Sequence, residues 1–144
     1  MKTRILPFAI LLLLTISSSA ILAQPATLEV VVTNIKEIKG SLRASLFTNE
    51  SMFLKEEYRG QVVKVTGQVM TILFENLPKG DYALSVIHDE NENGELDTNF
   101  MGIPNEGFAF GNNAQGTFGP PSFDKTLVEI SEGVTKHSIR LKYY

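Results

Sequence analysis

The feature that most constrains the fold is an alternation of apolar and polar residues that begins at Thr27. Segments such as "TLEVVVTNI" and "SLRASLFT" are rich in apolar and β-branched residues and carry apolar side chains at about every second position. Successive side chains of a strand face opposite sides of a sheet, so this pattern is typical of strands with one buried face. We therefore expect a domain built from strands.

Turn residues divide the chain into about seven strands. The first two segments flank "KEIKG", in which Gly40 favours a turn, and we expect them to form a hairpin. Two strands around Gly67 are predicted by "QVVKVTGQVMTILFENL", a fifth by "DYALSVIHD", and two more by "KTLVEIS" and "TKHSIRLKYY" around Gly133. This spacing predicts an all-β fold, a single antiparallel β-sandwich. At most one short helix is expected, near residues 51–58 with Ser51 as a cap.

The alternation stops in residues 100–123, which hold five glycines, three prolines and five phenylalanines. We expect one long loop without regular structure, and such loops are usually functional in a compact domain. Its aromatic content is unlike that of disordered segments. Phe108, Phe110, Phe118 and Phe123 are candidates for an aromatic platform that binds a ligand. The alternative is that these rings pack onto the sandwich as a small core of their own.

The first residues predict export. Lys2 and Arg4 precede an apolar run, and small residues follow it up to Ala23, which is the pattern of a secretory signal peptide. The apolar run is shorter than the roughly 20 residues of a membrane span. We expect residues 1–23 to be removed and residues 24–144 to form one domain in the periplasm or outside the cell. The alternative is a retained N-terminal anchor.

Charge and cysteine content exclude some classes of function. Without Lys2 and Arg4 the chain has 11 basic and 16 acidic residues, a balance that argues against nucleic acid as a partner. The absence of cysteine excludes thiol chemistry and disulfides. The stability of the domain must then come from packing or from a bound metal.

Three longer motifs carry a resemblance to a known family. The segments "FENLPKGDYALSVIHDENENGELDTN", "GIPNEGFAFGNNA" and "GPPSFDKT" together resemble the DUF2141 family of exported bacterial proteins, over nearly all of the mature chain. The first part, "FENLPKGDYAL", is also similar to the strand-turn-strand of prealbumin-like and carboxypeptidase-regulatory-like β-sandwiches. The resemblance implies a sandwich and an exported location, and it carries over no catalytic residue.

The segment "DENENGELD" is the main candidate for a metal site. In calcium loops of the D-x-[DN]-x-[DN]-G type, side-chain oxygens at alternating positions converge on the ion because the glycine allows a sharp turn. The predicted ligands are the side chains of Asp89, Asn91, Asn93 and Asp97, the last through water, with the backbone carbonyl of Glu95. The alternative is a solvated polar turn.

The match to a full EF-hand loop ends at Phe100, where a bidentate glutamate would be needed. Remaining ligands must come from elsewhere, and Glu106, Asp124 and backbone carbonyls of the long loop are the candidates. Because two of the leading ligands are neutral amides, we expect calcium to bind weakly, on the order of 10⁻⁴ to 10⁻³ M. His88 is expected to be packed or hydrogen-bonded, since it has no partner at a spacing that suits zinc.

The sequence favours a non-enzymatic function. We expect an exported binding module whose calcium-ordered loop presents a surface to a protein or polymer of the cell envelope or the extracellular space. One alternative is a hydrolase of envelope polymers, in which Asp89 with Asp97, or Glu106 with Asp124, would act as acid and base. The other alternative is a structural sandwich with no ligand beyond the metal. The acidic residues cluster at a spacing that suits an ion, which favours the binding module.

Overall fold

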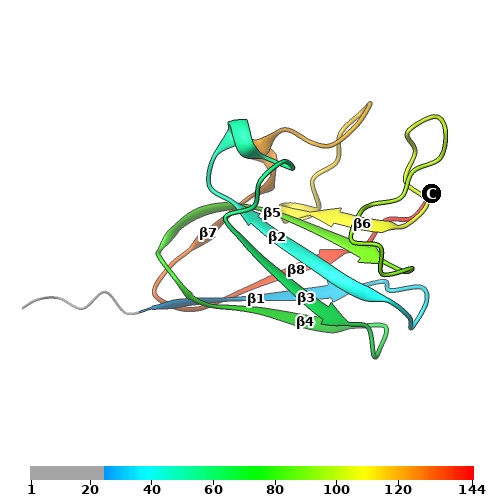
Figure 1. Ribbon diagram of the computed structural model, residues 1–144. Coiled ribbons are helices and arrows are strands. Elements are labelled where there is room, and N and C mark those ends of the chain that lie inside the picture. Colours follow the sequence, from blue (N-terminus) through cyan, green and yellow to red (C-terminus); the bar gives the residue numbers. More distant parts are fainter. Residues whose placement is uncertain (1–24) are drawn as a thin grey trace, which may run out of the picture.

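The computed structural model describes residues 25–144, which form two stacked sheets (Figure 1). The three-stranded sheet has the order β4-β1-β8 and contains β1 (Ala26–Thr33), β4 (Met70–Leu77) and β8 (Gly133–Arg140). The five-stranded sheet has the order β3-β2-β5-β6, and β7 also pairs with β5. Its members are β2 (Ser41–Phe47), β3 (Arg59–Lys64), β5 (Gly80–Asp89), β6 (Gly107–Phe110) and β7 (Leu127–Ile130). The all-β sandwich is confirmed, and the predicted signal peptide lies outside the described residues.

The core lies between the two sheets and follows the alternation seen in the sequence. Residues of β1 alternate strictly between buried and partly exposed, so that Leu28, Val30 and Val32 are fully buried. Ile72 and Phe74 of β4 are buried beside them. Burying side chains of this size contributes about 1.5 to 3 kcal/mol each, so packing of the two inner faces stabilises the domain.

The predicted hairpin between the first two strands is wrong. β1 pairs with β4 and, in parallel, with β8, whereas β2 pairs with β3 and β5 in the other sheet. The connection between β1 and β2 therefore crosses from one sheet to the other, and Asn34 and Gly40 turn in it with φ of +64° and +63°. Both strands need to bury an apolar face, and facing each other across the core satisfies both.

The long loop is more ordered than predicted. Residues 107–110 form β6, which pairs with the C-terminal half of β5 and raises the number of strands in the described residues to eight. Two 3-10 turns follow, η2 (Gly111–Asn113) and η3 (Phe123–Thr126). The predicted short helix is a single 3-10 turn, η1 (Glu50–Met52), and its cap is Asn49 instead of Ser51. No helix in the described residues is long and apolar enough to cross a membrane.

β5 organises the candidate site. Its first half, Gly80–Ala83, pairs with β7, and residues Ser85–His88 pair with β6 on the same side, while β2 lies along its other side. The strand is therefore buried in the middle of its sheet. Its last residue, Asp89, begins the loop that connects β5 to β6.

Candidate functional site

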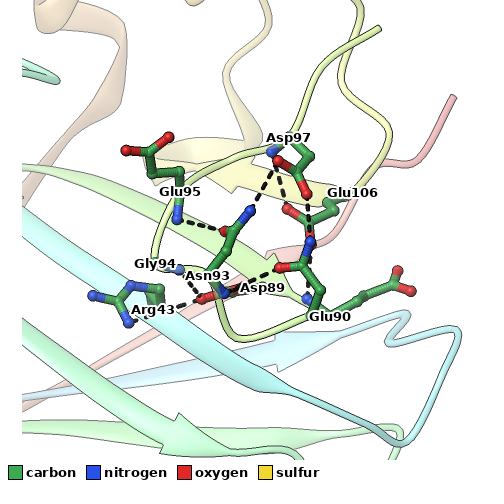
Figure 2. Close-up of polar contacts among 9 residues, drawn as sticks. Arg43, Asp89, Glu90, Asn93, Gly94, Glu95, Asp97 and Glu106 are labelled. Carbon is green, nitrogen blue, oxygen red and sulfur yellow. Dashed lines mark hydrogen bonds and ion pairs between the residues drawn. The ribbon is translucent and has the colours of Figure 1, made fainter.

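Asp89 fixes the turn at the start of the loop after β5 (Figure 2). Its side chain is fully buried. One carboxylate oxygen accepts the backbone N–H of Asn93 at 3.1 Å, and the other accepts that of Gly94 at 2.9 Å. Gly94 has a φ of +89°, which residues with a Cβ rarely adopt. The motif glycine is thus required by the turn itself.

Arg43 compensates the buried charge of Asp89. It lies on β2, beside β5, and its Nη1 is 3.8 Å from Oδ2 of Asp89. Its guanidinium also lies against Gly94, where an added Cβ would come within 3.9 Å of it. A buried carboxylate is costly unless it is paired and hydrogen-bonded, and Asp89 has both kinds of partner. Arg43 also places a positive charge beside the predicted metal position.

The side chains of the two asparagines and of Asp97 in the motif are hydrogen-bonded to one another. The Oδ1 atoms of Asn91 and Asn93 accept the backbone N–H groups of Asn93 and Glu95 at 3.1 and 2.9 Å. Their Nδ2 groups donate to the two carboxylate oxygens of Asp97 at 2.6 and 2.9 Å. Glu95 contributes its backbone N–H to this network, while its carboxylate points away from it (Figure 2).

Glu106 ties the two ends of the loop together. Its side chain comes from the residue before β6 and is buried, with 5% of its surface exposed. One oxygen accepts the backbone N–H of Glu90 at 2.8 Å, and the other accepts that of Asp97 at 3.0 Å. We call the side chains of Asp89, Asn91, Asn93, Asp97 and Glu106 the polar ring. The Glu106 carboxylate therefore anchors the loop, whereas the sequence suggested it only as a possible metal ligand.

The second candidate ligand, Asp124, lies elsewhere. It is exposed on η3, which leads into β7, and β7 pairs with the end of β5 opposite to Asp89. The structure therefore does not bring Asp124 to Glu106. Within residues 25–144, no group of three or more histidine, cysteine, aspartate or glutamate side chains is arranged to hold a metal. A cation at the polar ring would depend on the amide oxygens of Asn91 and Asn93 as well as on carboxylates.

The loop continues beyond the polar ring as a small hairpin with an apolar tip. Residues 97–105, which we call the tip hairpin, are closed by the bridge between Thr98 and Pro104 and by a bond from Asn105 N to Asp97 O at 2.8 Å. At the tip, Oδ1 of Asn99 accepts the N–H groups of residues 101 and 103. The side chains of Phe100, Met101 and Ile103 are nonetheless 97%, 65% and 36% exposed.

The four candidate phenylalanines of the long loop have different environments. Phe110 and Phe123 pack on Phe53, with ring centroids 6.3 and 5.7 Å apart, so they cover the sandwich. Phe108 is partly buried and stacks on Tyr144. Phe118 is fully exposed. The structure does not bring the four rings together into one platform.

His88 is a buried, hydrogen-bonded residue, as predicted. Its Nε2 lies 2.9 Å from the carbonyl oxygen of Lys39 and its Nδ1 lies 2.8 Å from the hydroxyl of Tyr143. Because the carbonyl can only accept, the ring proton lies on Nε2, and the tyrosine hydroxyl donates to Nδ1. Burial raises the pKa of Tyr143 above its ordinary value, which keeps that proton in place.

These features define an eight-stranded β-sandwich domain with an anchored loop at one end of its central strand. The family described as "Uncharacterized protein conserved in bacteria (DUF2141)" matches residues 30–138, which include the second half of β1, β2 to β7, the polar ring and most of β8. The chain belongs to this family. Neither the search of curated proteins nor the search of solved structures found a match.

Proposed function

We propose that this protein is an exported, non-enzymatic binding module that presents the tip hairpin to a protein or polymer of the cell envelope or the extracellular space. The observation that carries the proposal is the contrast at the tip. Asn99 fixes the backbone with two side-chain hydrogen bonds, while Phe100 remains 97% exposed. Three neighbouring apolar side chains on an ordered turn form a small surface that gains free energy when a partner covers it.

Two free-energy contributions favour binding at the tip: burial of the Phe100 ring and the existing order of the loop backbone. Fully burying a phenylalanine side chain stabilises by about 1.5 to 3 kcal/mol. Ordering a loop residue costs about 1 to 2 kcal/mol of backbone entropy, and binding by a loop that is already ordered avoids that cost. The polar ring and the bonds of Asn99 provide this order in advance, which suits recognition.

We further propose that calcium binds at the polar ring. A carbonyl oxygen has two lone pairs, and Oδ1 of Asn91 and of Asn93 each use one for a backbone N–H. The second is available to a hard cation, together with Asp97. Calcium would have to displace the two amide N–H groups from Asp97 and oppose the charge of Arg43. Because of these costs we expect calcium to bind weakly, with a dissociation constant on the order of 10⁻⁴ to 10⁻³ M.

Export is supported by the first 23 residues, whose charged start, apolar centre and small-residue end suit a signal peptide.

The contacts of the acidic residues support a binding module over the hydrolase alternative. Asp89 and Glu106 both accept two backbone N–H groups, so these carboxylates already serve the loop. An acid–base pair needs carboxyl groups that are free to exchange protons with a substrate.

Site-specific photo-crosslinking tests the presentation of the tip. In cells that produce the protein, p-benzoylphenylalanine at position 100 should form a discrete crosslinked product, because that side chain would lie against the partner. The matched control carries the same group in place of Thr71, which is exposed on β4 of the other sheet. Products of equal yield at both positions, or none at position 100, would contradict the proposal.

A further inference from the structure

A cleft lies where the open edges of the two sheets, β6 and β8, approach each other. It measures about 420 Å³ and is bounded by β6 and the residues after it on one side, and by the end of β8, the C-terminal segment and the residues after β1 on the other. Phe108 and Lys142 join the two sides by reciprocal backbone hydrogen bonds of 3.0 and 2.8 Å. The volume lies in the range of small-molecule sites, about 300 to 1,000 Å³.

Three basic side chains line this cleft, and no acidic side chain does. The cations are Lys36, Arg140 and Lys142. The ion pairs among residues 25–144 involve other basic groups, and none of these three takes part in one. The whole chain has a formal charge of −3, so a concentration of unpaired positive charge at one cleft is unusual for its composition.

Neutral groups hold these cations in place. Nη2 of Arg140 donates to the amide oxygen of Asn34 at 3.2 Å, and Nζ of Lys142 donates to that of Gln115 at 3.4 Å. Nζ of Lys36 lies 4.7 Å from the centroid of the Tyr143 ring. Amide oxygens and ring faces orient a cation but do not cancel its charge. The three cations are therefore oriented without an ion-pair partner among the described residues.

The rim of the cleft is built on strained backbone. Asn112 and Asn113 both have positive φ, +57° and +52°, which is uncommon for two successive residues other than glycine. Asn113 Oδ1 accepts the backbone N–H of Arg140 at 2.7 Å, which clips η2 to the end of β8. Such strain persists only where surrounding contacts maintain it, and it is concentrated at functional sites.

The remaining wall of the cleft is apolar. Phe108, Ala109 and Leu141 line it together with the ring of Tyr143. We propose that this cleft binds a small ligand that combines an acid group, such as a phosphate or carboxylate, with a flat apolar body. The acid group meets the three cations, and Arg140 can bind it with two parallel N–H donors. The apolar body lies against Phe108 and Tyr143.

Phenyl phosphate is a suitable probe, since it has one acid group on one ring. In a titration of the purified protein followed by amide NMR, the backbone signals of Phe108, Asn113 and Lys142 should shift and saturate. Benzyl alcohol, which has the ring without the charge, should bind at least about tenfold more weakly. Added sodium chloride should weaken phenyl phosphate, because the attraction is electrostatic. Equal binding of the two probes would overturn the proposal.

Variants locate the site. Arg140→Gln should weaken phenyl phosphate binding about tenfold or more. Its thermal stability should stay close to that of the native protein, because reduced repulsion among the three cations offsets the lost hydrogen bond to Asn34. Lys36→Gln is a second variant with the same expected direction and keeps the backbone bond to Tyr143. Lys136→Gln is the control, since that residue of β8 pairs with Glu29 at 3.4 Å. Unchanged binding in both cleft variants would overturn the proposal.

Discussion

Glu106 illustrates how one side chain determines the shape of the candidate site. The loop from Glu90 to Asp97 would otherwise have two backbone N–H groups at its base without acceptors, and the single buried carboxylate satisfies both. Hydrogen bonds to a charged acceptor contribute about 1.5 to 3 kcal/mol each. The position of Asp97, and with it the start of the tip hairpin, therefore depends on a residue that follows it by nine positions.

Replacing this carboxylate by an amide should weaken the loop. In Glu106→Gln, the side-chain NH₂ group cannot accept an N–H, so one donor at Glu90 or Asp97 loses its partner. We expect a loss of about 1 to 3 kcal/mol in the free energy of unfolding, and faster proteolysis within residues 97–105. Glu95→Gln is the matched control, because the Glu95 carboxylate is exposed and outside the polar ring. Equal stability and cleavage rates in the two variants would contradict the role of Glu106.

At the scale of single residues, the sequence predicts contacts between residues that are close together in the chain. Asp89, Asn91, Asn93 and Asp97 were identified as candidate ligands from their spacing around a glycine, and their side chains take part in the hydrogen bonds of one loop. Arg43 could not be identified from the motif, because its position depends on the pairing of β2 with β5. The positions of Glu106 and Asp124 could not be predicted for the same reason. Strand pairing brings Glu106 to Glu90 and places Asp124 near the opposite end of β5.

At the scale of elements, alternation predicted the strands but not their partners. The period-two pattern shows which face of a strand is buried, and for β1 this agrees with the structure. It does not show which sheet the strand joins, and the short connection to β2 suggested a hairpin where the chain changes sheets. β6 was missed because its four residues, "GFAF", are mostly buried and show no alternation among the surrounding glycines.

The contact between η2 and β8 should make stability depend on pH. Nε2 of His137 on β8 accepts the backbone N–H of Asn112 at 3.0 Å, and partial burial lowers the pKa of His137 below its ordinary value of 6.5. The unfolded chain therefore takes up a proton more readily than the folded protein. The contribution of His137 to folding stability is complete at pH values above the ordinary pKa. It is lost as the pH falls through that pKa toward the lower pKa of the folded state.

A histidine variant isolates this effect from other titrating groups. In His137→Gln, the side-chain oxygen can still accept the N–H of Asn112, but the side chain does not titrate. We expect the melting temperature of the native protein to fall more than that of the variant between about pH 7.5 and about pH 5.5. Thermal melts at several pH values give the slope of melting temperature against pH for each protein. All other titrating groups contribute equally to both slopes, so the difference between the slopes belongs to His137. Parallel curves would show that His137 is not responsible.

At the scale of the whole molecule, the polar ring and the cationic cleft share one short strand. Glu106, in the ring, is followed two residues later by Phe108, in the wall of the cleft. β6 between them is held by β5 on one side and by the bridge to Lys142 on the other. β6 is therefore a fixed element beside both sites, and the ligands proposed for the two sites have opposite charge.

Calcium should stabilise the loop within an otherwise unchanged sandwich. Binding to the folded state alone, with calcium at 100 times its dissociation constant, would add about 2.7 kcal/mol to the free energy of unfolding. A chelator should then lower the melting temperature and increase proteolysis of residues 97–105. The far-ultraviolet circular dichroism spectrum should keep its β character, because the strands are paired independently of the loop. Magnesium should substitute poorly, since it requires near-octahedral geometry and retains its waters.

Two variants with opposite expected effects decide whether calcium acts at the polar ring. Asp97→Asn removes a ligand charge and should weaken calcium binding in titration calorimetry. Arg43→Gln removes the positive charge that lies 3.8 Å from Asp89 and should strengthen it, even if the variant is less stable without calcium. A polar turn without a metal has no reason to respond in this way, because there both variants would only lose interactions. If neither variant changes the heat of calcium addition, and calcium does not alter proteolysis of the native loop, the hydrogen bonds of the ring hold the tip hairpin without an ion.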